Sequence, residues 1–91
     1  MIASYSVYRR TIAIWFDMQN DLWRSLDGKV PIRIKQASYL SPVGHRTLAV
    51  QKPKFGNKVK VYCYDAYGDV WVADLKLLDL GPWSLVQKRD Q

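Results

Sequence analysis

The alternation of apolar and polar side chains is clearest in residues 58–75. In 58–64, two valines and Cys63 alternate with lysine and tyrosine, and valines alternate with other residues again from 70 onward. A period of two is typical of a half-buried β-strand. The connection, residues 65–69, holds Asp and Gly, and Gly supplies the positive φ that short hairpin loops need. The pattern therefore predicts a β-hairpin.

The direction of Trp71 depends on how the hairpin loop is counted. If Val70 and Val72 point inward, Trp71 points outward and is a candidate interface anchor, because tryptophan is enriched at binding hot spots. If the register differs by one residue, Trp71 belongs to the core. Both alternatives stay open at this stage. The other tryptophans are expected in the core: Trp15, Trp23 and Trp83.

Other segments have strand-like composition. Residues 4–16 are rich in β-branched and aromatic side chains. They fit one long strand, or two strands with a kink at Arg9–Arg10, while a looser spacing of three and four over 12–26 fits a competing helix. Three further segments fit short strands: 29–35, 46–52 and 83–86.

Two helical pieces are also predicted. The first is a short helix over about 17–27, with Asp17 as its N-cap and Gly28 just beyond its end. The second is a helical turn at about 75–79, preceded by Asp74 as a cap candidate. No internal repeat is evident in the sequence.

Short strands of this number in 91 residues predict a mainly β fold in a single domain spanning 1–91. We expect a small barrel or a rolled antiparallel sheet of five to six strands, because closure removes exposed strand edges. The order of strand, turn, strand and tight helical turn from Lys58 to Leu78 resembles the end of an SH3-like barrel, as in Tudor and KOW modules. That resemblance implies an SH3-like barrel and transfers no functional residue.

The charge is concentrated in the middle of the chain. Fourteen basic and eight acidic residues, all of the latter Asp, give a net charge of +6. Residues 1–28 are balanced, residues 29–60 hold eight basic groups and no acidic one, and residues 61–91 sum to −2. A localised basic field favours a polyanion or an acidic protein partner. A surface that is basic only for solubility is the alternative.

The sequence offers little catalytic chemistry. It holds one histidine, His45, one cysteine, Cys63, and no Glu, which is too few ligands for a zinc site. Ser41 and His45 share a loop, yet no nucleophile or phosphate-loop motif accompanies them. We therefore expect no enzyme, no metal and no small-molecule cofactor. Asp65 and Asp69 are expected to hold the turn, and Cys63 to be a small buried hydrophobe.

No apolar run approaches the roughly 20 residues that would span a membrane. The N-terminal residues show no basic flank that leads into an apolar run, so a signal peptide is not expected. These two features predict a cytoplasmic protein without a membrane span.

A basic, aromatic-bearing β face is the surface predicted to bind. If the strand in 29–35 pairs with the hairpin, cations and rings share one side of a sheet. The protein is then a small non-enzymatic interaction protein that docks on an acidic protein partner as an accessory subunit or inhibitor. The predicted binding residues are Arg33, Lys35, Lys58, Lys60, Tyr62, Tyr64, Tyr67 and Trp71.

Two other ligands fit the same residues. A single-stranded nucleic acid, RNA above all, is the main alternative, because lysines engage phosphates and flat rings stack on splayed bases. A cage for a methylated cation, built from the three tyrosines and Asp65, is a third alternative that the basic surroundings disfavour.

Overall fold

The structure is a computed structural model and describes residues 2–7, 9–19, 21–36, 47–52, 56 and 58–89. The described residues are mainly strand and include no helix, so the mainly β prediction is confirmed. The strands are β1 (Ile2–Val7), β2 (Arg10–Phe16), β3 (Leu22–Leu26), β4 (Ile32–Arg33), β5 (Lys35–Gln36), β6 (Thr47–Gln51), β7 (Lys58–Tyr64), β8 (Val70–Lys76), β9 (Asp79–Leu80) and β10 (Ser84–Gln87).

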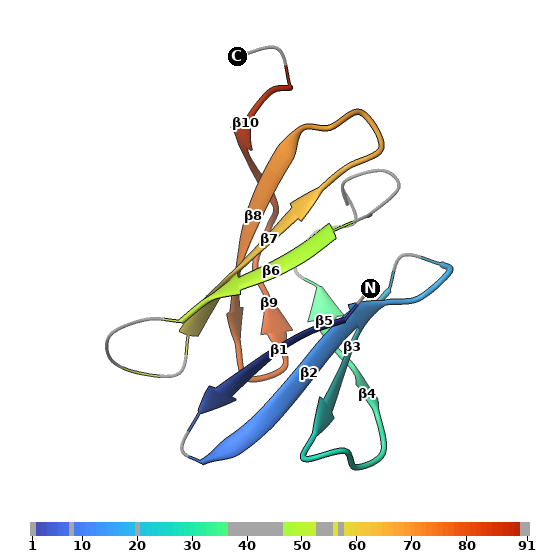
Figure 1. Cartoon of the computed structure of the whole chain (residues 1–91), viewed down its shortest axis with the longest axis vertical. Helices are drawn as coiled ribbons and strands as arrows, with labels where there is room; N and C mark the ends of the chain where they lie inside the picture. Colours follow the sequence, from blue (N-terminus) through green and yellow to red (C-terminus); the bar gives the residue numbers. More distant parts are fainter. Residues whose placement is uncertain are drawn as a thin grey trace.

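The strands form two mainly antiparallel sheets (Figure 1). Sheet A has the order β1-β2-β3-β4. Sheet B has the order β5-β9-β8-β7-β6, with β10 paired to β8 and a parallel pair between β5 and β9. The edge strands β1 and β6 of the two sheets are in contact, and the Lys52 amine donates to the Ser6 carbonyl at 3.4 Å.

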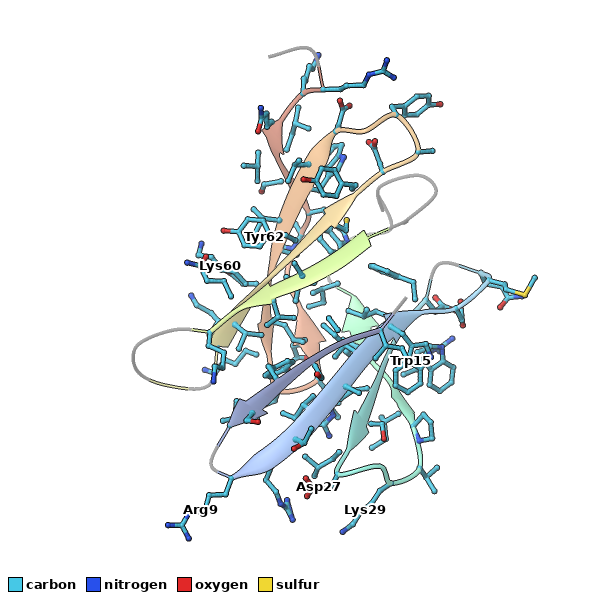
Figure 2. The ribbon with its side chains drawn as sticks, viewed as in Figure 1. Arg9, Trp15, Asp27, Lys29, Lys60 and Tyr62 are labelled. Carbon is cyan, nitrogen blue, oxygen red and sulfur yellow. The ribbon has the colours of Figure 1, made fainter. Side chains whose placement is uncertain are left out.

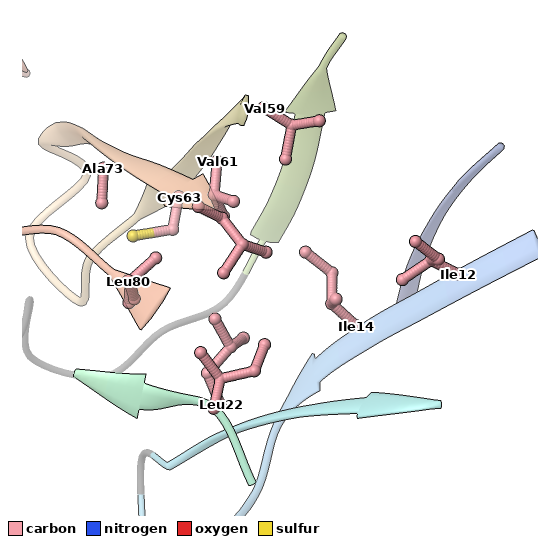
Figure 3. Close-up of a cluster of buried hydrophobic side chains, with 10 residues drawn as sticks. Ile12, Ile14, Leu22, Val59, Val61, Cys63, Ala73 and Leu80 are labelled. Atoms are coloured by element: carbon pink, nitrogen blue, oxygen red, sulfur yellow. The ribbon is translucent and has the colours of Figure 1, made fainter. Parts of the chain in front are cut away.

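One apolar core lies between the two sheets (Figure 3). Strand alternation turns one face of each sheet inward, and the core side chains on these faces are 0–9% exposed. Ile34, which is 2% exposed, joins the core from the link between β4 and β5. The other core residues are Ile12, Ile14 and Leu22 from sheet A and Val59, Val61, Cys63, Ala73, Leu75 and Leu80 from sheet B.

The hairpin predicted over 58–75 is confirmed as β7 and β8, and Gly68 in its loop has a φ of 87°. The register places Cys63 opposite Trp71, so Trp71 shares the inward face with the buried cysteine. Val70 and Val72 therefore point outward, and Trp71 is partly buried against the core. The alternative in which Val70 and Val72 point inward is wrong, because the loop sets a pairing register that differs from that alternative by one residue.

The short helix predicted at 17–27 is wrong, because residues 22–26 form β3 and pair with β2. Leu22 is fully buried, while Trp23 points to the opposite face of sheet A. Asp27 and Gly28 form the tight turn that follows, with φ values of 50° and 74°. Positive φ at both central residues is the requirement of a type I′ hairpin turn. A helix C′ position also needs positive φ, so the same Gly fits both structures.

The helical turn predicted at 75–79 is also wrong. Leu77 and Leu78 connect β8 to β9, and Leu77 has a φ of 55°. Leu75 and Leu80 lie directly opposite each other and are each 1% exposed. Antiparallel pairing of β8 with β9 buries both leucines on one face of the sheet. The free energy of this burial outweighs the weak local preference for a helical turn.

The remaining strand predictions have mixed outcomes. Residues 4–16 form two strands, β1 and β2, joined by a tight turn in which Arg9 has a φ of 64°. The strands predicted at 46–52 and 83–86 are present as β6 and β10. Residues 29–35 hold parts of two short strands that belong to different sheets.

The tryptophans predicted for the core divide between two environments. Trp83 packs against the core, with its ring 6.1 Å from that of Phe16. Trp15 and Trp23 lie opposite each other on the outer face of sheet A and are half-buried. Alternation assigns them there, because Ile14 and Leu22, their chain neighbours, take the inward positions.

Candidate functional site

The outer face of sheet B carries an apolar and aromatic surface, which we call the tyrosine face. Tyr62 lies between Ala49 of β6 and Val72 of β8, and Tyr64 lies opposite Val70. A hollow of about 200 Å³ is lined by Ala49, Tyr62, Cys63, Tyr64 and Val70. Tyr64 is 48% exposed and Tyr62 is half-buried, so both rings are accessible from solvent.

The Tyr62 side chain is anchored, because its hydroxyl donates a hydrogen bond to the Gln51 side-chain oxygen at 3.1 Å. This bond joins β7 to β6 across the sheet. A ring held in one orientation loses less conformational entropy when it binds. The hollow beside Tyr62 is therefore partly preformed.

A lysine strip, formed by Lys58, Lys60 and Lys76, lies next to the tyrosine face along β7 and β8. Lys60 and Tyr62 project from the same side of β7 (Figure 2). Asp74 lies 3.9 Å from the amines of both Lys58 and Lys60. Asp79 of β9 lies opposite Lys76. Two exposed carboxylates screen the three amines only weakly, so the strip keeps a net positive charge.

Tyr67 and Trp71 lie apart from this surface. Tyr67, at the tip of the β7–β8 loop, is 67% exposed. Trp71 points to the inward face, and its indole N–H donates to the Asp65 carboxylate at 2.8 Å. Trp71 therefore supports the loop, and its side chain is not an exposed anchor.

Arg33 and Lys35 are not brought to the tyrosine face. Arg33 belongs to β4 in sheet A, where it lies opposite Trp23 and 3.8 Å from the Asp21 carboxylate. The register aligns it with Trp15 and Ile2 in one row across the outer face of sheet A. Lys35 begins β5, which β9 and β8 separate from β7. The pairing that would have joined these cations to the hairpin is absent from the described strands.

The basic segment 29–60 is consequently divided between the two sheets. Lys29 follows the last residues of β3 in sheet A, whereas Lys52, Lys58 and Lys60 belong to the β6–β7 region of sheet B. Arg46 and Lys54 lie outside the described residues. The charge excess thus does not form one patch among the described residues, and this weakens the case for a long polyanion.

Two loops share an aspartate-centred arrangement that sequence reasoning missed. The Asp17 carboxylate accepts the N–H groups of Gln19 and Asp21 at 2.8 and 2.9 Å and the indole N–H of Trp23 at 2.7 Å. The Asp17 N–H donates to the Asp21 carbonyl at 2.9 Å.

The same bonds recur 48 residues later in the chain. The Asp65 carboxylate accepts the N–H groups of Tyr67 and Asp69, both at 2.9 Å, and the Trp71 indole N–H. The signal was available as the spacing Asp-x-x-x-Asp-x-Trp at 17–23 and 65–71. This short repeat corrects the expectation of no repeat, and it holds loop geometry, as expected for Asp65.

Hydrogen bonds lower the pKa of both aspartates. For Asp17 the largest cause is the Trp23 indole, followed by the Asp21 N–H. For Asp65, burial acts to raise the pKa, but hydrogen bonds from the Trp71 indole and the loop N–H groups outweigh it and lower the pKa.

We expect these two carboxylates to make the fold sensitive to acid. Their folded pKa values lie below the ordinary value of 3.8, so they contribute stability that is present above that pH and lost as the pH falls through the lower folded pKa. In thermal melts from about pH 7 to about pH 2, the Asp17→Asn/Asp65→Asn variant should lose less stability on acidification than wild type. Asp79→Asn, an exposed position on β9, is the matched control. An acid loss as steep in the double variant as in wild type would contradict this role.

The described ranges contain no group of three or more His, Cys, Asp or Glu side chains placed to hold a metal ion. Ser41 and His45 lie outside the described residues. Within the described part of the chain, no helix has the length and apolar character needed to cross a membrane.

No protein-family model, curated protein or solved structure matches this chain.

Proposed function

We propose that the protein is a small non-enzymatic interaction protein that docks on an acidic protein partner, as an accessory subunit or inhibitor, through the tyrosine face and the lysine strip. The observation that carries the proposal is the hollow between Tyr62 and Tyr64, which opens on the same face as Lys58 and Lys60. Tyrosine supplies contact area at a low entropy cost, and lysines at the rim steer an acidic partner.

The geometry suggests what the partner presents. An apolar or aromatic side chain would fill the hollow of about 200 Å³, and carboxylates a few residues away would face the lysine strip. An acidic segment with a single apolar anchor meets both conditions. The predictions that the protein is cytoplasmic and that its fold is an SH3-like barrel are part of this proposal.

A single-stranded nucleic acid is the second candidate. Two residues apart on a strand, Tyr62 and Tyr64 are spaced by about 7 Å, so each could stack on one of two splayed bases. It ranks second because the described basic residues of 29–60 are divided between two sheets and do not line one path for a backbone.

The test is a fluorescence-anisotropy titration with an acidic peptide that carries one central Phe. We expect Tyr62→Ala/Tyr64→Ala to weaken binding by at least about tenfold, because central aromatic residues supply most of the energy of an interface. The Tyr62→Phe/Tyr64→Phe variant keeps the rings and should bind within about threefold of wild type. Lys60→Ala should weaken binding, whereas Lys29→Ala, its matched control on sheet A, should not (Figure 2).

A short single-stranded RNA, titrated in parallel, separates the two candidates. Equal peptide affinity in wild type and the double alanine variant would overturn docking through this face. RNA binding that exceeds peptide binding, and that the same variant abolishes, would assign the face to nucleic acid.

A further inference from the structure

A second cavity lies against the inner face of sheet A, next to the turn between β8 and β9. Its volume is about 460 Å³, within the range of about 300–1,000 Å³ typical of small-molecule sites. Its apolar walls are Val7, Ile12 and Leu26 of sheet A, with Leu77 from the β8–β9 turn. It is separate from the tyrosine face, which is the outer surface of sheet B.

Arg24 occupies this apolar inner face. It lies on β3 opposite Ile14, at an inward position between Leu22 and Leu26. The Arg24 Nε is buried, and no described residue accepts its hydrogen bond. A buried donor without an acceptor is unfavourable, and a charged one more so. If Arg24 only stabilised the fold, we would expect a carboxylate of the protein beside its guanidinium.

Arg10, the other arginine that lines the cavity, does have a carboxylate partner. The Nε of Arg10 lies 3.1 Å from the Asp27 carboxylate, so its charge is compensated within the protein. Among the described residues, no ion pair compensates Arg24. Arg24 is therefore the cationic group lining this cavity that has no carboxylate partner among the described residues.

Tyr5 adds a second donor. Burial raises the pKa of the Tyr5 phenol, and the positive charge of Arg24 opposes that rise in part. The hydroxyl therefore stays protonated at neutral pH and can donate a hydrogen bond, and Tyr5 lines the same cavity as Arg24. An oxygen of an anionic ligand can accept from both groups.

We propose that this cavity binds a small monocarboxylate with an apolar body, with its carboxylate on the Arg24 guanidinium and the Tyr5 hydroxyl. A planar guanidinium matches a carboxylate in two parallel hydrogen bonds. The apolar walls fit a hydrocarbon chain or ring, which an inorganic anion would lack. The ligand would neutralise the one charge of the cavity that the described residues leave uncompensated.

The experiment is a titration of the ¹⁵N-labelled full chain with octanoate, followed by NMR, and with n-octanol as the uncharged probe of equal chain length. Octanoate should shift the Arg24 Nε–H signal and the backbone N–H signals of Val7, Leu26 and Leu77, and octanol should bind at least about tenfold more weakly. Arg24→Met should weaken octanoate binding by at least about tenfold and leave octanol binding unchanged.

Two further variants keep the test decisive. Arg33→Met removes an arginine from the outer face of the same sheet and should leave octanoate binding unchanged. Arg24→Lys keeps the charge without the planar fork and should bind octanoate with intermediate affinity. Octanoate that shifts none of these signals, that binds no better than octanol, or that binds Arg24→Met as well as wild type would overturn the proposal. None of these outcomes bears on docking through the tyrosine face.

Discussion

Ile14→Ala is expected to lower the free energy of unfolding by about 2–5 kcal/mol, the range for truncating a buried Ile or Leu. Ile14 is fully buried, and it faces the core from β2 while Val59 and Val61 face it from β7 (Figure 3). The lost methyl groups leave a cavity that the two sheets cannot close without moving. At about 4–8 °C per kcal/mol for a domain of this size, the thermal midpoint should fall by roughly 8–40 °C.

Urea unfolding of wild type and variant, with equal slopes, measures this difference. Val30→Ala is the matched control, because Val30 is 83% exposed and its truncation should change stability by less than about 0.5 kcal/mol. If Ile14→Ala costs no more than Val30→Ala, the two sheets do not share the core described above.

The Cys63 thiol is expected to react with iodoacetamide about a thousandfold more slowly in the native protein than in the unfolded chain. Burial, with a smaller contribution from the Asp65 carboxylate, raises the pKa of Cys63 from 9.0 to about 12. At about pH 8 this shift cuts the reactive thiolate by about three orders of magnitude. Its 1% exposure restricts access further.

The raised pKa also sets the sign of a pH effect. The protonated thiol is favoured in the folded state, so its contribution to stability is fully present below the unfolded value of 9.0 and is lost as the pH rises toward about 12. Labelling followed by mass spectrometry, with and without denaturant, measures the protection. Ser4→Cys in a Cys63→Ala background supplies an exposed thiol on β1 as the control. Native Cys63 that reacts as fast as this control would show that the hairpin face is not buried.

The alternation of side chains along a strand depends only on residues close together in the sequence, and features of this kind were predicted correctly. The hairpin of β7 and β8, the burial of Cys63 and the positive φ of Gly68 all follow from short stretches of sequence. The tyrosines and lysines of β7 share their outward face for the same reason, because alternate residues on one strand point the same way. That part of the candidate site could be predicted.

Ambiguous local signals account for the errors in secondary structure. An Asp carboxylate that accepts nearby backbone N–H groups caps a helix or closes a loop with the same chemistry, and Asp17 closes a loop. Gly28 likewise fits a helix end or a hairpin turn. Pairing of β3 with β2 across the loop decides between them, because the same apolar residues fit a helical spacing or two paired strands.

By itself the sequence determined that the chain is mainly β, which residues alternate on each strand, and that its charge excess lies in 29–60. The tertiary structure alone decided which strands are neighbours. It separated Arg33 from the tyrosine face, turned Trp71 inward and left Arg24 in an apolar cavity. The physical reason is that strand partners and sheet packing depend on contacts between distant segments, and these contacts leave no period in the local sequence.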